Sequence, residues 1–173
     1  YAYNASNNST LRGSKGTTLE GGIRVPFVVS WPGTLTGNRS FNAPAISLDI
    51  AVTAMAAAGI VKQPKMALDG IDLLPHLKGE VNSAPHKQLF WRSWGQMAIR
   101  QGDWKLVSYV AKMDEGELKR GEPRDIMTPY RLYNLRRDVG ERQDLAAKEP
   151  ERVADMLGAW RAWNTQMKIP PQS

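Results

Sequence analysis

A glycine-rich loop near the start of the chain carries the residues best suited to chemistry. Residues 11–26 include four glycines, and Lys15 lies between the first two of them. Backbone N–H groups exposed in such loops form concave anion sites, and a lysine adds a full charge with three donors. The loop therefore predicts an oxyanion-binding site with Lys15 as its cation. The same composition also fits a glycine-rich turn whose lysine is merely solvated.

Two further charges follow Lys15 within the loop, Glu20 and Arg24. We expect them to form a structural pair that holds the loop against a sheet, rather than to act as catalysts. The hydroxyls of Thr17 and Thr18 are expected to make local hydrogen bonds.

The elements that must position this loop can be predicted from the sequence that follows. Residues 27–31 are short, apolar and β-branched and are closed by Pro32-Gly33, which predicts a buried strand and a turn. Residues 47–58 predict a helix that is capped by Ser47 and ends at Gly59, with Asp49 in its first turn.

The second half of the chain changes to short strands after a connection at residues 79–87. Residues 88–94 are aromatic-rich, and residues 96–100 and 103–109 flank Gln101-Gly102, which predicts a hairpin. Residues 130–135 predict another strand, and the charged segment 111–129 predicts a long loop with the highest mobility of the chain. A helix is expected from Pro150 to an end at Pro170-Pro171. Its core-facing stripe is expected at Val153, Met156, Leu157, Trp160, Trp163 or Asn164, and Met167.

Composition narrows the classes of function. The 173 residues suffice for one domain, or for one domain and part of another. The net charge of +6 is scattered rather than striped, so nucleic-acid binding is not favoured, although an anionic substrate is compatible with it. The absence of cysteine excludes disulfides, zinc thiolates and cysteine nucleophiles, and no apolar run is long enough for a membrane helix.

The amino-acid sequence of the loop closely resembles a motif of one protein family. Type I, formylglycine-dependent sulfatases of the alkaline phosphatase superfamily have a loop of the form G-x-K-G-x-x-x-E-G-G-x-R-V-P, and this chain has Gly13-Ser14-Lys15-Gly16-Thr17-Thr18-Leu19-Glu20-Gly21-Gly22-Ile23-Arg24-Val25-Pro26. The resemblance extends to residues 47–60, 69–79, 97–107 and 131–151. It implies that Lys15 reaches the sulfate group of a sulfate ester and serves as the catalytic and substrate-binding residue of this chain.

The resemblance also implies chemistry that these residues lack. Family members make formylglycine from a C/S-x-P-x-R motif and hold Ca²⁺ with carboxylates and an Asn, almost all in their N-terminal part. Ser83-Ala84-Pro85-His86-Lys87 echoes that motif but ends in Lys and follows the lysine loop, so we do not expect modification there. His76 and His86, the two histidines of the chain, make a poor metal site; we expect His76 to be structural and His86 at most to touch substrate.

These observations lead to one interpretation and its alternatives. The fold class is α+β or α/β, with the end of the sulfatase α/β domain at residues 1–80 and a small antiparallel sheet with a packed C-terminal helix at residues 81–173. The function is the C-terminal part of a sulfatase, inactive alone, with no cofactor in this chain but Ca²⁺ and formylglycine in the complete enzyme. The alternatives are a stand-alone, non-catalytic binding module and a phosphonate or phosphate monoester hydrolase.

The expected partners follow from the same interpretation. They are a sulfate ester substrate and an upstream sulfatase segment, because the chain begins at Tyr1 and residues 1–10 contain no Asp for the family's metal-binding Asp-Asn pair. A piece of this kind should expose apolar surface and tend to form homo-oligomers. No nucleic acid and no membrane span are expected, and the resemblance implies a periplasmic or secreted location.

Overall fold

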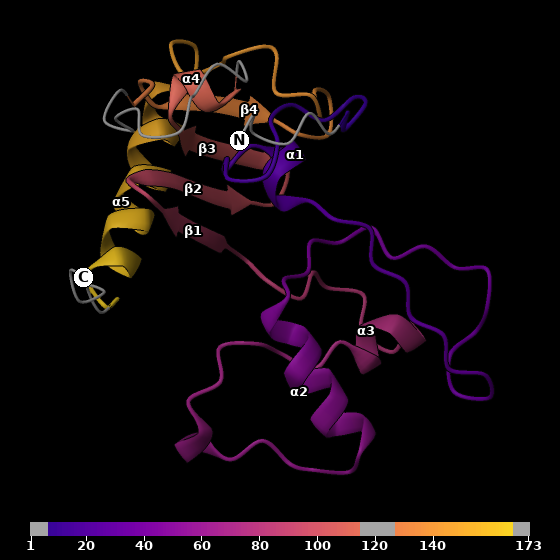
Figure 1. Cartoon of the computed structure of the whole chain (residues 1–173). Helices are drawn as coiled ribbons and strands as arrows, with labels where there is room; N and C mark the ends of the chain where they lie inside the picture. Colours follow the sequence, from indigo (N-terminus) through magenta and orange to yellow (C-terminus); the bar gives the residue numbers. More distant parts are fainter. Residues whose placement is uncertain (1–6, 115–126, 168–173) are drawn as a thin grey trace. The chain divides into compact units, whose positions relative to one another are not determined.

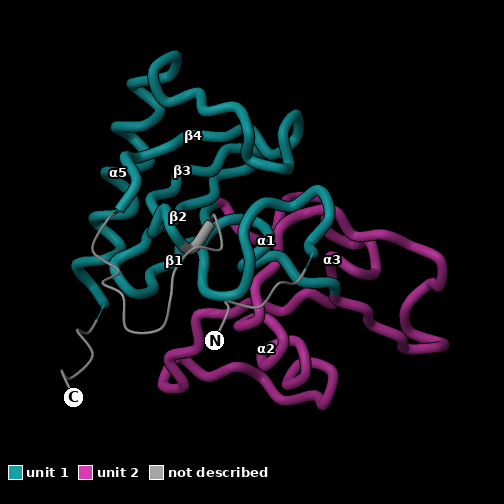
Figure 2. Tube along the Cα trace, turned by 45° about the horizontal axis from the view of Figure 1, so that its top comes forward, with its two compact units in different colours: residues 1–26, 88–173 teal, residues 27–87 magenta. Residues whose placement is uncertain are grey.

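The computed structural model of the chain describes residues 7–114 and 127–167. Its contacts form two compact units, residues 1–26 together with 88–173, and residues 27–87 (Figures 1 and 2). This division differs from the expected one at residue 80, because the glycine-rich loop packs with the C-terminal sheet and belongs to the same unit. The expected connection at 79–87 does end where the second stretch of unit 1 begins.

Unit 1 is built on a four-stranded antiparallel meander with the order β1-β2-β3-β4. The strands are β1 (Leu89–Ser93), β2 (Gln96–Gln101), β3 (Trp104–Ser108) and β4 (Arg131–Asn134). Gln101 pairs with Trp104, which confirms the hairpin predicted at Gln101-Gly102. The β1–β2 turn is made by Trp94 and Gly95, both with positive φ (47° and 80°), as the two-residue hairpin loops with primed turns require.

One face of the sheet is covered by the C-terminal helix α5 (Pro150–Asn164), which lies against β2 and β3 (Figure 1). Met156 of this helix packs with four buried residues that alternate along the strands, namely Met97, Ile99, Leu106 and Leu132. Pro150 occupies the first helical turn, where its missing N–H costs nothing. The predicted antiparallel sheet with a packed terminal helix is therefore confirmed.

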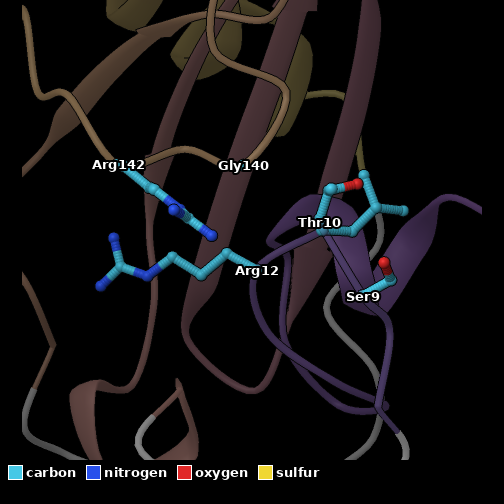
Figure 3. A pocket seen from close by; sticks show the side chains of 6 residues that line it. Ser9, Thr10, Arg12, Gly140 and Arg142 are labelled. Carbon is cyan, nitrogen blue, oxygen red and sulfur yellow. The ribbon is translucent and has the colours of Figure 1, made fainter.

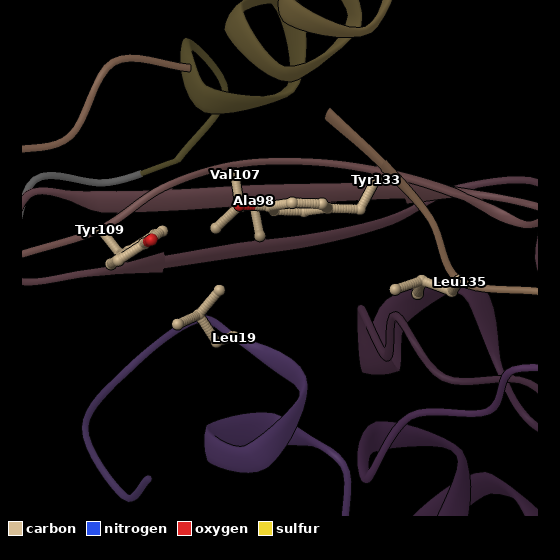
Figure 4. Packing of buried hydrophobic residues seen from close by; sticks show 6 residues of the cluster. All are labelled: Leu19, Ala98, Val107, Tyr109, Tyr133 and Leu135. Atoms are coloured by element: carbon tan, nitrogen blue, oxygen red, sulfur yellow. The ribbon is translucent and has the colours of Figure 1, made fainter. Parts of the chain in front are cut away.

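The other face of the sheet is covered by the glycine-rich loop and its short helix α1 (Glu20–Ile23). Leu19, at 0% exposure, packs with Ala98, Val107, Tyr109, Tyr133 and Leu135 (Figure 4). Strand residues alternate between the two faces of the sheet with a period of two. Alternate positions of the same strands therefore pack against the loop on one face and against α5 on the other. Unit 1 is thus a three-layer arrangement of loop, sheet and helix.

Unit 2 contains α2 (Leu48–Ala57), the 3₁₀ turn η1 (Pro64–Met66) and α3 (Leu74–Lys78). The predicted helix at 47–58 is confirmed, and Gly59 ends it with φ of 72°. The Ser47 side chain does not cap it. Asp49 instead lies fully buried and accepts from the backbone N–H groups of Ile46 and Ile71, at 2.9 Å each.

The predicted buried strand at residues 27–31 is wrong. The structure has no strand there, and the side chains of Phe27 and Val28 are 58% and 88% exposed. An isolated strand is not stable in water without a partner to satisfy its backbone groups. No strand in the described part of the chain pairs with these residues.

Unit 1 also includes the four-residue helix α4 (Ala111–Asp114), where a loop was expected. Most of the mobile loop predicted at 111–129 lies outside the described residues, as do Pro170 and Pro171. The terminal helix that was expected to end at Pro170-Pro171 already ends at Asn164, so that predicted end is wrong. In the part of the chain that the structure covers, no helix combines the length and apolarity that a membrane crossing needs.

Candidate active-site loop

Lys15 lies at the tip of a tight turn and is exposed to solvent. The backbone N–H of Thr17 donates to the carbonyl of Ser14 at 3.0 Å, which closes a four-residue turn around Lys15 and Gly16. Gly16 has φ of 97°, a conformation that favours glycine at the third turn position. The Thr17 hydroxyl also donates to the Ser14 carbonyl, at 2.9 Å. The predicted local bond of Thr17 is thus confirmed, whereas the buried Thr18 hydroxyl has no hydrogen-bond partner among the described residues.

The loop is wound closely on itself behind this turn. The N–H of Gly21 donates to the carbonyl of Arg12 at 2.7 Å, and a Cβ at Gly21 would collide with the carbonyl of Gly13. The side-chain amide of Asn8 donates to the carbonyls of Gly13 and Gly21, at 2.8 and 3.1 Å. The base of the loop is therefore closed by backbone contacts that only glycine permits.

A buried cluster of three charges fixes the C-terminal end of the loop to the sheet. Lys105 of β3 is fully buried, and its Nζ lies 2.9 Å from Glu20 Oε1 and 2.8 Å from Glu141 Oε1. The side chains of Glu20 and Glu141 are 3% and 0% exposed. Glu141 Oε2 also accepts from the backbone N–H of Glu20, at 2.6 Å. These contacts link residues that are 85 and 121 positions apart.

The charges of this cluster do not balance, because one ammonium faces two carboxylates. Burial raises the pKa of Glu141 above its ordinary value, although Lys105 and the Glu20 backbone bond oppose the shift. Arg24 is 3.8 Å from Glu20 and half exposed. The expected Glu20–Arg24 pair is thus present, but the nearer partner of Glu20 is Lys105, which the sequence did not single out.

An open pocket of about 440 Å³ lies beside the loop in unit 1 (Figure 3). It is lined by Ser9, Thr10, Leu11, Arg12, Gly140 and Arg142. Arg12 donates to the Glu141 carbonyl at 2.8 Å, and its guanidinium carbon lies 5.7 Å from the centre of the Tyr109 ring. Two guanidinium groups and no carboxylate line this pocket, so it suits an anionic group.

The remaining candidate residues lie in unit 2 and make structural contacts. His86 Nε2 is 3.0 and 2.8 Å from the two carboxylate oxygens of Asp49, a contact that the sequence did not reveal. His76 lies in α3, with its ring 6.3 Å from that of Phe41, and its structural role stays a prediction. Nowhere in residues 7–114 and 127–167 do three or more His, Asp or Glu side chains gather where they could hold a metal ion.

Known proteins give an independent comparison. The model of the family described as "N-sulphoglucosamine sulphohydrolase, C-terminal" matches residues 14–157. Arylsulfatase A of Homo sapiens is 34% identical over 146 residues, covering 78% of this chain and 28% of the relative. Arylsulfatase A of Bos taurus is 31% identical over 160 residues, covering 86% of this chain and 31% of the relative. The solved structure of Ps i-CgsB in complex with k-i-k-neocarrahexaose has a TM-score of 0.77 at 27% identity, covering 96% of this chain and 34% of that one.

The chain thus spans about three tenths of the length of the relatives it matches, as the covered shares of 28%, 31% and 34% show. The family match begins at Ser14, immediately before Lys15, and includes most of the loop, the whole sheet and the first half of α5. The resemblance inferred from the loop motif is therefore confirmed by matches that extend over almost the whole chain. The chain belongs to the sulfatase family and corresponds to the C-terminal segment of its members.

Proposed function

We propose that this chain is the C-terminal part of an enzyme that hydrolyses sulfate esters, and that Lys15 binds the sulfate group. The observation that supports the proposal is the exposed ammonium of Lys15 at the tip of a turn whose base is fixed to the sheet. Lysine suits a tetrahedral anion, and a positioned cation stabilises the charge on a transferring group. The family matches support the reaction class, since two of the relatives that match carry the name arylsulfatase A.

The residues of this chain do not fit the other two groups that the reaction requires. The chain has no cysteine for formylglycine. In the segment Ser83-Ala84-Pro85-His86-Lys87, the His86 side chain is bound to Asp49 of α2. The described residues also lack a carboxylate cluster for Ca²⁺. In our proposal, both groups therefore come with an upstream segment, and this chain alone is inactive.

The exposed apolar residues 25–31 also support the proposal that an upstream part of the polypeptide packs against this chain. Val25, Phe27, Val28, Val29 and Trp31 are all exposed, with Val28 at 88%. Apolar side chains gathered on one extended stretch are typical of a surface that another chain segment covers. The same proposal has three further parts. The chain belongs to the alkaline phosphatase superfamily, the protein is periplasmic or secreted, and isolated chains associate through this surface.

The experiment compares turnover of an aryl sulfate by the polypeptide that joins this chain to its upstream segment, with and without Lys15→Ala. We expect kcat/KM to fall by about 10²- to 10³-fold, as when one donor to a developing anion is removed. Lys148→Ala, at an exposed lysine of the same unit, should change kcat/KM less than about twofold. Unchanged turnover in Lys15→Ala would overturn the assignment of Lys15.

The chain on its own, with added Ca²⁺, should give no turnover of the same substrate. Turnover that Lys15→Ala abolishes would show instead that the described residues are sufficient for catalysis. Phosphate and phosphonate monoesters serve as competing substrates, and faster hydrolysis of either would favour the monoester hydrolase alternative. Binding of sulfated ligand without any turnover, even when the upstream segment is present, would favour the non-catalytic module.

A further inference from the structure

Gln96 is a buried amide on the same face of the sheet as the glycine-rich loop. It is the first residue of β2 and is 0% exposed. The positive φ angles of Trp94 and Gly95 fix the turn immediately before it, so its backbone position is set by a tight hairpin. Ala98, two residues further along the strand, packs against Leu19 of the loop, which shows that this face of β2 points to the loop.

The side chain of Gln96 reaches the tip of the loop. Its Nε2 donates to the carbonyl of Gly16 at 2.7 Å, across 80 positions of sequence. Gly16 follows Lys15 directly, so this bond fixes the peptide on the C-terminal side of the lysine. The other anchors, from Asn8 and Lys105, hold the base of the loop and its C-terminal end.

We infer that Gln96 is a positioning residue for Lys15, acting through the Gly16 carbonyl to hold the lysine where it meets the sulfate group. The inference rests on the proposed function of Lys15. A lysine has four rotatable side-chain bonds, and its ammonium can be placed reproducibly only if the backbone that carries it is fixed. An amide is suited to this role because it donates to a carbonyl without adding a second charge beside the anion.

The first test measures the loop itself and does not depend on activity. Amide hydrogen exchange of the full 173-residue chain is compared between the natural sequence, Gln96→Ala and Gln101→Ala. Thr17 donates its amide to Ser14 within the same turn, so its exchange rate reports on loop order. We expect about tenfold faster exchange at Thr17 in Gln96→Ala, which corresponds to the loss of one hydrogen bond of about 1.4 kcal/mol.

Gln101 is the matched control, because it is exposed at the other end of the same strand. Gln101→Ala should leave the exchange rate of Thr17 unchanged. Ile99 and Leu106, which pair in the centre of the sheet, should stay protected in both variants, showing that the fold is intact. Unchanged exchange at Thr17 in Gln96→Ala would overturn the inference without any bearing on what Lys15 binds.

The second test separates positioning from mere stability with a double-mutant cycle in the sulfatase polypeptide that contains this chain. We expect Gln96→Ala alone to lower kcat/KM about tenfold for an aryl sulfate. In the Lys15→Ala background the same change should have no further effect, because its whole influence passes through Lys15. Independent, additive losses would overturn the inference, whereas unchanged turnover in Lys15→Ala alone would instead refute the proposed function.

Gln96→Glu gives a pH readout in a side chain of nearly the same shape. The ionised carboxylate cannot donate to the Gly16 carbonyl, but the protonated acid can. Activity of Gln96→Glu relative to the natural enzyme should therefore recover as the pH falls through the pKa of the new carboxyl group. A constant ratio across the pH range would contradict a role for the donated hydrogen bond.

Discussion

Lys105→Met tests whether the buried charge cluster fixes the glycine-rich loop to the sheet. Methionine matches the apolar stem of lysine but removes the ammonium that lies 2.9 and 2.8 Å from the two carboxylates. At an effective dielectric constant of 20, each contact corresponds to about 6 kcal/mol of gross attraction, most of it offset by desolvation. Because Glu20 and Glu141 stay buried without their cation, we expect a loss of about 3–5 kcal/mol in the free energy of unfolding.

Urea unfolding followed by tryptophan fluorescence measures this loss. Unit 1 contains five of the six tryptophans, whereas Trp31 alone lies in unit 2, so the signal reports mainly on unit 1. With an m-value of about 1.5–2 kcal/mol/M, the midpoint should fall by about 2 M. Lys148→Met, at an exposed lysine, should shift the midpoint by less than about 0.3 M.

Two further measurements can refute this reasoning. The loss should shrink as the pH falls from about 7.5 to about 5, because burial raises the pKa of Glu141 and its unpaired carboxylate can then take up a proton and lose its charge. Combining Lys105→Met with Glu20→Gln and Glu141→Gln should recover part of the stability, because no buried charge is left unpaired. A loss below about 1 kcal/mol, or a loss that does not change with pH, would show that the cluster is not what holds the loop.

Two other predictions concern buried carboxylates of the two units. The raised pKa of Glu141 means that its contribution to stability is present below its unfolded pKa of about 4.5 and is lost as the pH rises through the folded pKa. The stability of the natural chain minus that of Glu141→Gln, measured by urea unfolding, should therefore decrease from pH 4 to 7, and an increase would contradict the assignment. Asp49→Ala removes the carboxylate that binds the backbone N–H groups of Ile46 and Ile71 and the ring of His86. The free energy of opening measured by hydrogen exchange in unit 2 should therefore fall by about 3 kcal/mol, while the sheet of unit 1 stays protected. Asp49→Asn should have a smaller effect.

Local signals were sufficient to predict most of the elements of this chain. The helix at Leu48–Ala57, the hairpin at Gln101-Gly102 and the terminal helix from Pro150 all follow from spacing and from residues that start or stop an element. The strand predicted at 27–31 failed for a reason outside the segment itself. Strand propensity becomes structure only when a partner strand lies alongside, and the described residues provide none.

The candidate site could be predicted only in its local part. The motif around Lys15 identified the loop, and the glycines indicated that its backbone is tightly wound. Lys105, Glu141 and Gln96 were missed because each meets the loop across 80 or more positions, which no local pattern records. One sequence signal was available for Lys105, since it is a lysine within the apolar strand Trp104–Ser108 and its position alternates with Leu106. A charge on an otherwise apolar strand indicates a buried partner, but it does not say which one.

Because Leu19 packs into the core of the C-terminal sheet, the glycine-rich loop can fold only after the strands of that sheet have been synthesised. The loop emerges from the ribosome long before β2, β3 and Glu141, yet those elements supply the surface on which it rests. Until they are made, Leu19 has no apolar face to pack against, and Glu20 lacks the Lys105 ammonium, which is its nearer partner. A chain shortened from its C-terminus to before β2 would therefore keep the whole lysine motif and still lack an ordered loop, because the loop rests on residues that are synthesised after it.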